Sequence, residues 1–343
     1  MITGGQNYDT NTQTGASPAP DEEGALEKPE WRMGFSFDFG CSGIDQKWQE
    51  GKTDWEKKIL VPFCPESDLS GIGYKDFIPG VWYHRTITLT GEELKGDLLL
   101  HFGAVDYDAR VWINGVEAGR HQGGYVSFTF NITNLVKEGE NDITLFAADD
   151  VRGGKQPKGK QSHFFYSRGC DYTRTTGIWQ TVWLEWVPES YIEKVQYYPN
   201  LAEATLGIKA VVKGQGTLEA KAFYGGEPCG SVSAKSEGGT VTMTLPLSRL
   251  EKWEPGHGRL YDLTLTYGED KVESYFGMRE VRLDGEKFLI NDKSVFQRLV
   301  LDQGFYPDGI YTAPTEEALV KDVELSMAAG FNGARLHQKV FEP

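Results

Sequence analysis

The stretch Phe296-Gln297-Arg298-Leu299-Val300-Leu301-Asp302-Gln303-Gly304 is typical of a buried strand whose last residues are polar. A loop follows, then a helical pattern over 315–329, and then Asn332-Gly333-Ala334-Arg335-Leu336-His337, a second strand with a polar end. Strand, crossover helix and strand form a βαβ unit, which needs cover on both faces. A complete barrel needs about 250 residues. We therefore expect residues 281–343 to be the truncated start of a TIM (β/α)8 barrel, and the chain to be the front part of a longer protein.

Short runs of aromatic and β-branched residues, separated by Gly, Asp and Asn, fill residues 29–188. This sequence pattern predicts an antiparallel β domain. Arg110-Val111-Trp112-Ile113 is followed by Asn114-Gly115, a strong hairpin signal because both central residues of a type I′ turn need positive φ. So many strands predict a sandwich of jelly-roll type. We expect core positions, rather than ligand-stacking ones, for Trp112, Trp179, Trp183 and Trp186.

Pro188 interrupts this pattern, and a second β region with few polar clusters follows over 189–280. Its strands are spaced like those of a small immunoglobulin-like β-sandwich, and polar clusters are rare in it, so we expect a spacer. Residues 1–28 are rich in Gly, Thr, Ser, Pro, Asn and acids without apolar periodicity, which predicts a disordered tail. The predicted fold class is thus mainly β, with a barrel start after two sandwiches.

The charge of the chain limits its partners. A net charge of −15 argues against nucleic acid or an anionic membrane surface, because binding phosphates needs clustered Lys and Arg. No apolar run reaches the length of a membrane span, and the chain as given shows no export signal, so we expect a cytoplasmic protein. The cysteines lack the spacing of a metal site or a disulfide scaffold, so we expect reduced thiols, no metal and no cofactor. They are Cys41, Cys64, Cys170 and Cys229.

Two polar clusters are candidates for chemistry. Asp302 with Gln303, and Arg335 with His337, come at the carboxyl ends of the two expected barrel strands, and barrel active sites lie at that end. Buried hydrogen bonds that close the barrel rim are the alternative. The second cluster is the loop 167–178, because loops on a rigid β scaffold often carry recognition. Two loop tyrosines beside polar groups are candidates for stacking on a ligand: Tyr172 and Tyr306.

Several short motifs stand in a fixed order along the chain: Gly80-Val81-Trp82-Tyr83-His84-Arg85, Gly123-Gly124-Tyr125, Thr176-Gly177-Ile178-Trp179-Gln180 and Asp302 to Gly309. With the order jelly roll, immunoglobulin-like sandwich and barrel, they resemble glycoside hydrolase family 2, which includes β-galactosidases, β-glucuronidases and β-mannosidases. The resemblance covers nearly everything after about residue 31. It implies a carbohydrate substrate, and it allows a homo-oligomer of the full-length protein.

The resemblance also implies roles for single residues. Asp171 lies six residues before Gly177-Ile178, where family members hold an aspartate that reaches the sugar site and can accept hydrogen bonds from two hydroxyls. A salt bridge from Asp171 to Arg168 or Arg174 is the alternative. His337 resembles a family histidine, although the usual Ser-His-Tyr-Pro motif here reads Leu-His-Gln-Lys. The expected substrate-binding residues are Asp171, Tyr172, Asp302, Gln303 and His337.

Retaining glycoside hydrolysis needs two carboxyl groups about 5 Å apart. In the resembling family these glutamates follow later barrel strands, so we expect no catalytic residue in this chain and no activity of the chain alone. The complete protein would be a retaining exo-β-glycosidase that hydrolyses terminal β-glycosidic bonds. The alternative is a non-catalytic carbohydrate-binding or scaffold module.

Overall fold

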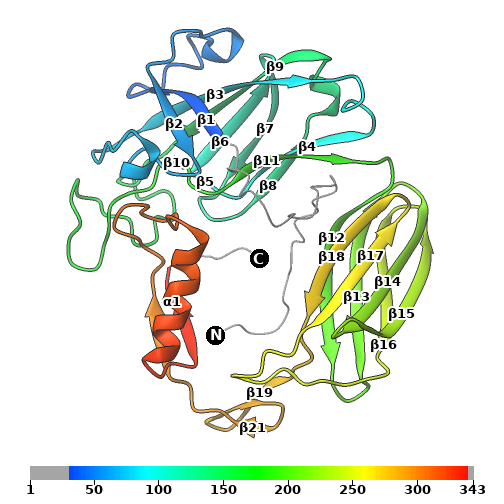
Figure 1. The fold of residues 1–343 in the computed structure, drawn as a ribbon. Coiled ribbons are helices and arrows are strands. Elements are labelled where there is room, and N and C mark those ends of the chain that lie inside the picture. Colours follow the sequence, from blue (N-terminus) through cyan, green and yellow to red (C-terminus); the bar gives the residue numbers. More distant parts are fainter. Residues whose placement is uncertain (1–30, 339–343) are drawn as a thin grey trace, which may run out of the picture.

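The computed structural model describes residues 31–338, which form three lobes in chain order (Figure 1). A β-sandwich lies at the top of the view, a second β-sandwich at the lower right, and a helix with two short strands at the lower left. The prediction of a mainly β fold with two successive sandwiches is confirmed. The tail predicted over 1–28 lies outside the described residues.

The first sandwich has a six-stranded antiparallel sheet and a three-stranded sheet around one core. Its strands are β1 (Trp31–Phe37), β2 (Lys57–Val61), β3 (Gly80–Leu89), β4 (Asp97–Phe102), β5 (Val105–Asp106), β6 (Asp108–Ile113), β7 (Val116–Gln122), β8 (Phe128–Asn131), β9 (Gly139–Ala148), β10 (Gly177–Ile178) and β11 (Val182–Val187). The larger sheet has the order β2-β1-β3-β9-β6-β7, the smaller one β11-β4-β8, and β10 pairs with β5. Short 3-10 turns lie at Trp48–Glu50, Asp68–Ser70 and Thr133–Leu135.

The hairpin predicted at Asn114-Gly115 is confirmed, because it joins β6 to β7 and its two residues have φ values of 51° and 81°. The expectation for the tryptophans holds for Trp112 and Trp179, which are buried. Trp186 is half-buried and still packs against the first core, whereas the expectation is wrong for Trp183, which is half-buried and outside the core clusters. Trp183 lies on the outer side of β11, where its ring stacks on His101 with centroids 4.7 Å apart.

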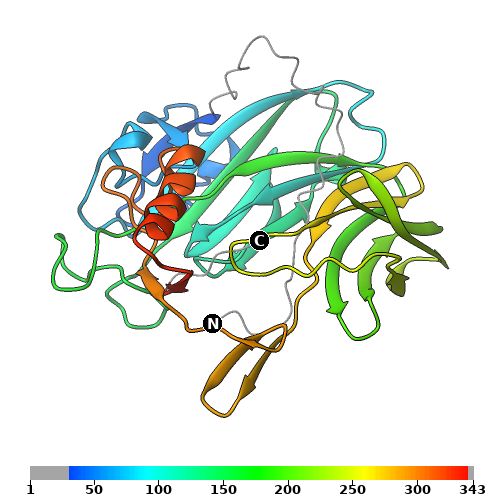
Figure 2. The same ribbon diagram turned by 60° about the horizontal axis from the view of Figure 1, so that its bottom comes forward.

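The second sandwich packs a three-stranded sheet against a four-stranded one (Figure 2). Its strands are β12 (Tyr191–Asn200), β13 (Thr205–Lys213), β14 (Gly216–Tyr224), β15 (Glu227–Ser236), β16 (Gly239–Pro246), β17 (Tyr261–Tyr267) and β18 (Asp270–Phe276). The sheet orders are β12-β13-β16 and β15-β14-β17-β18. Alternation explains the core, since in β16 Val241, Met243 and Leu245 are buried while the residues between them face solvent.

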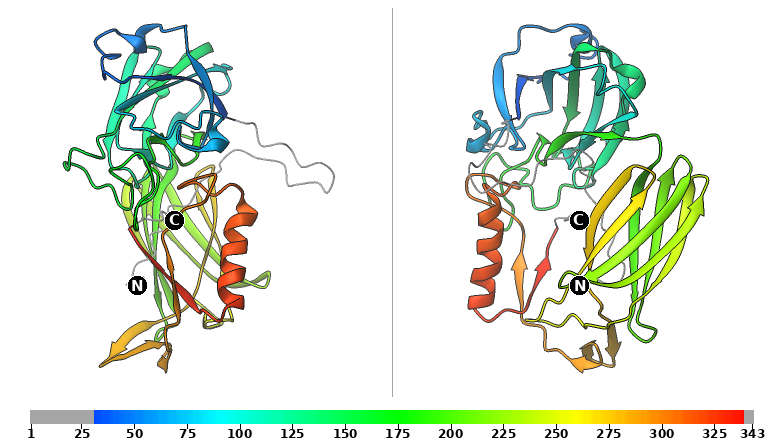
Figure 3. Two further views of the ribbon diagram at one scale, coloured as in Figure 1. Left: turned by 90° about the vertical axis from the view of Figure 1, so that its left-hand side faces the viewer. Right: turned by 45° about the vertical axis from the view of Figure 1, so that its right-hand side comes forward.

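The third lobe contains the βαβ unit (Figure 3). Its elements are β19 (Val281–Asp284), β20 (Lys287–Ile290), β21 (Lys293–Ser294), β22 (Leu299–Asp302), α1 (Glu316–Ala328) and β23 (Gly333–Leu336). β22 and β23 are parallel, and Thr315 caps α1 by accepting a hydrogen bond from the Ala318 N–H. The predicted βαβ unit is therefore present, whereas the TIM barrel that would contain it stays a prediction. Within residues 31–338, no helix combines the length and apolar character needed to cross a membrane.

The expectation of a buried strand over Phe296–Gly304 is wrong in extent and in burial. Only the four residues of β22 form a strand, Phe296 is 80% exposed and Leu301 is 51% exposed. The reason is that, among the described residues, β22 has a single neighbouring strand. The apolar residues of α1 are exposed as well: Leu319, Val320, Val323, Leu325 and Met327.

Leu145 offers a test of the first core, because it is fully buried in β9 between β3 and β6. Leu145→Ala should lower the free energy of unfolding by about 2–5 kcal/mol, through lost apolar burial and the cavity that remains. Urea unfolding followed by tryptophan fluorescence measures the change. Glu140→Ala, at an exposed position of the same strand, should change stability by no more than about 0.5 kcal/mol. Equal losses in the two variants would contradict this packing.

Candidate functional site

The segment between β22 and α1 docks on the first sandwich. Ile310 and Tyr311 share a buried cluster with Trp179. The Thr312 hydroxyl donates a hydrogen bond of 2.5 Å to the Trp179 carbonyl, and the Ser67 hydroxyl donates one of 2.6 Å to the Asp308 carbonyl. The carboxyl ends of β22 and β23 therefore point toward the first sandwich (Figure 3). Both polar clusters predicted from the sequence lie at this junction.

Asp171 is half-buried in the long loop before β10. Its carboxylate lies 3.5 Å from the Lys158 ammonium. The alternative of a salt bridge to Arg168 or Arg174 is wrong about the partner. Arg168 pairs with Asp171 through backbone hydrogen bonds alone. The Arg174 guanidinium is buried and donates hydrogen bonds to backbone carbonyls, such as that of Phe164. An ion pair at this distance, with both side chains partly exposed to solvent, is weak. The Asp171 carboxylate can therefore still accept hydrogen bonds from a ligand.

Tyr172 lies flat against Phe305, with ring centroids 4.1 Å apart and an angle of 19° between the ring planes. Its backbone N–H donates to the Lys160 carbonyl at 2.7 Å, which fixes the loop. One face of the Tyr172 ring is thus covered by Phe305. The other stacking candidate, Tyr306, donates its hydroxyl to Asp322 of α1 at 2.7 Å and ties the docking segment to the helix.

The structure brings Asp302 and His337 together at the ends of β22 and β23. The His337 N–H donates to the Asp302 carbonyl at 2.8 Å, while the Asp302 carboxylate accepts from the Gly304 N–H at 2.7 Å. Gln303 follows Asp302 in the sequence. Its side-chain oxygen Oε1 is buried and has no hydrogen-bond partner among residues 31–338. A buried acceptor of this kind commonly marks a site that a water or a ligand completes.

Sequence reasoning missed the lysines at this junction. The Lys160 ammonium lies 3.3 Å from the Cys170 thiol and close enough to His337 to affect it. Partial burial, together with the charges of Arg335 and Lys160, lowers the pKa of the His337 imidazole. The signal was in the sequence, because residues 152–174 hold six Lys and Arg residues and one acid in a chain of net charge −15.

Behind the loop lie three buried acids, Glu66, Asp106 and Asp149. The Gln161 amide group donates to the Asp106 carboxyl at 2.6 Å, and its Oε1 accepts from the Thr175 N–H at 2.8 Å. Gln161 itself is fully buried. This side chain therefore fastens the loop that carries Asp171 and Tyr172 to the sandwich beneath it.

Burial disfavours the charged form of these acids. It raises the pKa of Glu66 to about 7 and that of Asp149 to about 7, and it raises the pKa of Asp106 well above its ordinary value. Hydrogen bonds from Thr176 partly oppose the first two shifts, since its N–H donates to Glu66 and its hydroxyl to Asp149. Two carboxyl groups beneath the loop, those of Glu66 and Asp149, therefore change charge near neutral pH.

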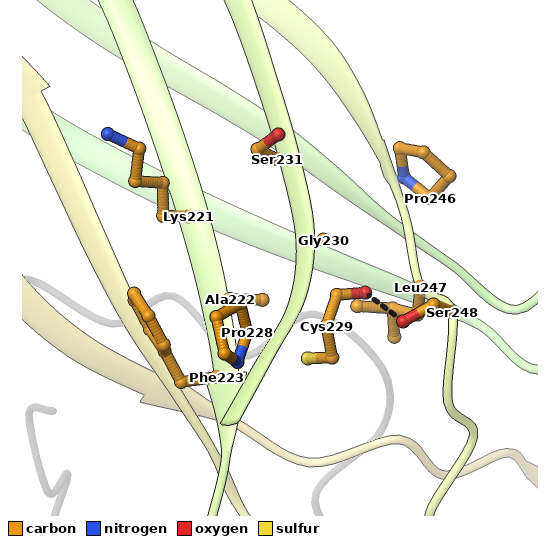
Figure 4. A pocket seen from close by; sticks show the side chains of 10 residues that line it. All are labelled: Lys221, Ala222, Phe223, Pro228, Cys229, Gly230, Ser231, Pro246, Leu247 and Ser248. Atoms are coloured by element: carbon orange, nitrogen blue, oxygen red, sulfur yellow. Dashed lines mark hydrogen bonds between the residues drawn. The ribbon is translucent and has the colours of Figure 1, made fainter. Parts of the chain in front are cut away.

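A hollow of about 620 Å³ lies elsewhere, on the second sandwich (Figure 4). It is formed by β14, β15 and the segment after β16, with Phe223, Pro246 and Leu247 among its walls. The Ser248 hydroxyl closes one side by donating to the Cys229 carbonyl at 3.0 Å. No carboxylate and none of the predicted site residues line it. The four cysteines of the described residues are free thiols, of which Cys64 and Cys229 are buried.

Two family models match the chain. Residues 26–188 match the model described as "Glycosyl hydrolases family 2, sugar binding domain", and residues 190–279 match the model "Glycosyl hydrolases family 2". Together they cover the two sandwiches.

Curated relatives are similar at low identity. A putative β-glucuronidase of Formosa agariphila is 26% identical over 272 residues, which are 75% of this chain and 32% of the relative. The β-glucuronidase of Sus scrofa is 26% identical over 317 residues, 81% of this chain and 48% of the relative. The β-galactosidase of Lactococcus lactis is 26% identical over 291 residues, with 81% and 26% covered. The chain thus spans less than half the length of these relatives.

A solved structure shares the fold. The crystal structure of Ruminococcus gnavus β-glucuronidase superposes with a TM-score of 0.75 at 20% identity, over 90% of this chain and 53% of that one. The superposition covers 90% of this chain, whereas the two family models match only residues 26–188 and 190–279. The structural similarity therefore extends beyond the two sandwiches.

Glu66→Gln tests the buried acids. Because folding raises the pKa of Glu66 from 4.5 to about 7, its contribution to stability is present below pH 4.5 and is lost as pH rises through about 7. Gln stays neutral and can still accept from the Thr176 N–H. The variant should match the parent at pH 4 and exceed its free energy of unfolding at pH 8 by about 3 kcal/mol.

Denaturant unfolding at both pH values measures the difference. The exposed Glu237→Gln serves as control and should show no such pH-dependent gain. A variant less stable than the parent at pH 8 would show that Glu66 is needed in its charged form.

Proposed function

This chain belongs to glycoside hydrolase family 2, and from that premise we propose that it is the amino-terminal part of a retaining exo-β-glycosidase. The complete protein would remove a β-linked sugar from the non-reducing end of a glycoside or oligosaccharide. In this proposal residues 29–188 bind the sugar, residues 189–280 are a spacer, and residues 281–343 begin the catalytic barrel. The glycosidase names of its relatives support the reaction class.

One observation carries the proposal: the loop that holds Asp171 and Tyr172 meets the carboxyl ends of two parallel strands. Active sites of barrels are built at those ends. The Asp171 carboxylate would accept hydrogen bonds from two sugar hydroxyls, and the face of Tyr172 turned away from Phe305 would stack on the ring. The buried oxygen of Gln303 would accept a further hydroxyl, and Asp302 and His337 would line the floor.

The chemistry itself requires more than these residues supply. Retention needs an acid and a nucleophile about 5 Å apart on opposite sides of the glycosidic bond. Asp171 and Asp302 match neither of the two glutamates that serve as acid and nucleophile in this family, because those glutamates follow later barrel strands. We therefore assign binding rather than catalysis to them, and place the catalytic glutamates on later strands of the barrel. Residues 1–343 alone should not hydrolyse aryl β-glycosides.

Asp171→Asn in the full-length protein tests the binding role. A panel of chromogenic aryl β-glycosides first identifies the substrate. Because a hydrogen bond to a charged group contributes about 1.5–3 kcal/mol, the variant should lose roughly ten- to a hundredfold in kcat/KM while its melting temperature changes little. Asp45→Asn, an exposed aspartate of the first sandwich, should keep the parent's activity. Equal kcat/KM in parent and Asp171→Asn would end the assignment.

A further inference from the structure

Arg174 is a fully buried arginine beneath the long loop that carries Asp171. Its guanidinium donates hydrogen bonds to four backbone carbonyls, which belong to two segments far apart in the sequence. They are the carbonyls of Lys75, before β3, and of Ser162, Phe164 and Phe165 in the loop. The Phe77 ring covers one face of the guanidinium, with 4.5 Å between the guanidinium carbon and the ring centroid. Arg174 therefore fastens one side of the loop to the first sandwich.

The hydrogen bonds of Arg174 reach Asp171 through a short run of backbone pairing. Ser162, whose carbonyl accepts from Arg174, donates its own N–H to the Tyr172 carbonyl at 2.8 Å. The Tyr172 N–H donates to the Lys160 carbonyl at 2.7 Å, so Tyr172 is held from both sides. Asp171 is the residue before Tyr172, and the position of its carboxylate depends on this pairing.

A guanidinium suits this place better than an ammonium. Its planar fork holds several N–H donors in fixed directions, whereas an ammonium is a point charge on a flexible stem. Burial lowers the pKa of Arg174, and the charges of Glu66, Asp76 and Asp149 oppose that shift. Arginine keeps its proton at such a depth, whereas a buried lysine loses its proton more readily. Buried carbonyls that lose their donor cost free energy, so removal of the fork should let this part of the loop move.

We propose that Arg174 is a positioning residue for sugar binding, whose guanidinium holds the long loop in the conformation that presents Asp171 and Tyr172. The inference rests on the proposed function, because Arg174 takes part in the reaction only through Asp171. Arg174 is fully buried beneath the loop, so it acts through the backbone of the loop and touches no sugar itself.

Hydrogen exchange in the full-length protein, followed by mass spectrometry, tests the hold on the loop. In Arg174→Lys, peptides that cover residues 160–172 should exchange about tenfold faster than in the parent, while peptides of β17 keep the parent's rates. Arg152→Lys is the matched control and should exchange like the parent, because this exposed arginine faces the same Phe77 ring at 4.0 Å but lies outside the buried fork.

Phe77→Leu is a milder second variant, because it keeps Arg174 and removes the ring from its face. It should accelerate exchange of the same loop peptides by a smaller factor. Unchanged exchange of these peptides in both Arg174→Lys and Phe77→Leu would overturn the proposal.

A double-mutant cycle separates positioning of Asp171 from a general loss of stability. Arg174→Lys should lower kcat/KM about tenfold on the aryl β-glycoside that the full-length parent hydrolyses. In the Asp171→Asn background the same substitution should cost less than about threefold, because the carboxylate that it positions is already gone. Equal losses in the two backgrounds would overturn the positioning role.

The two measurements also separate this inference from the proposed function. Faster loop exchange in Arg174→Lys, together with full activity of Asp171→Asn, contradicts the sugar-binding role of Asp171 and supports the hold of Arg174 on the loop. Lost activity in Asp171→Asn, together with unchanged exchange and unchanged kcat/KM in Arg174→Lys, supports the role of Asp171 and overturns the inference.

Discussion

The contact between Tyr311 and Trp179 is the constraint on which the candidate site depends. The two rings pack with centroids 5.3 Å apart, and Phe305 covers Tyr311 from another side at 4.2 Å. The hydroxyl of Thr312 adds a hydrogen bond to the same backbone that carries Trp179. The chain leaves the first sandwich at Pro188 and returns to it here, so the strand ends of the βαβ unit lie beside the loop that carries Asp171 and Tyr172.

Acidic and basic side chains occupy different depths at this junction. Protonatable carboxyl groups lie beneath the loop, where burial keeps them from ionising easily, and cations lie on its outer side. Arg174 connects the layers, since its guanidinium is buried among backbone carbonyls and feels the fields of Glu66 and Asp149. An acidic protein can in this way present a positive surface at one place without a general excess of basic residues.

Features that depend on neighbouring residues were predictable from the sequence. The Asn114-Gly115 turn follows from backbone preferences and is observed. Features set by distant segments were not. The ion-pair partner of Asp171 and the approach of Lys160 to His337 depend on how loops dock, and the exposure of β22 depends on which strands pair with it. Apolar periodicity identifies the face that a strand can bury, but not what covers it.

The exposed apolar side of α1 has a consequence for motion. Local opening of a segment costs little when few apolar contacts are broken, so regions of one protein differ in how well their amide hydrogens are protected from exchange with solvent. The central strand β9 is bonded on both sides and buried, whereas α1 is held mainly by its cap and by the bond from Tyr306 to Asp322. Among residues 31–338 we therefore expect the amide hydrogens of α1 to exchange with solvent faster than those of β9.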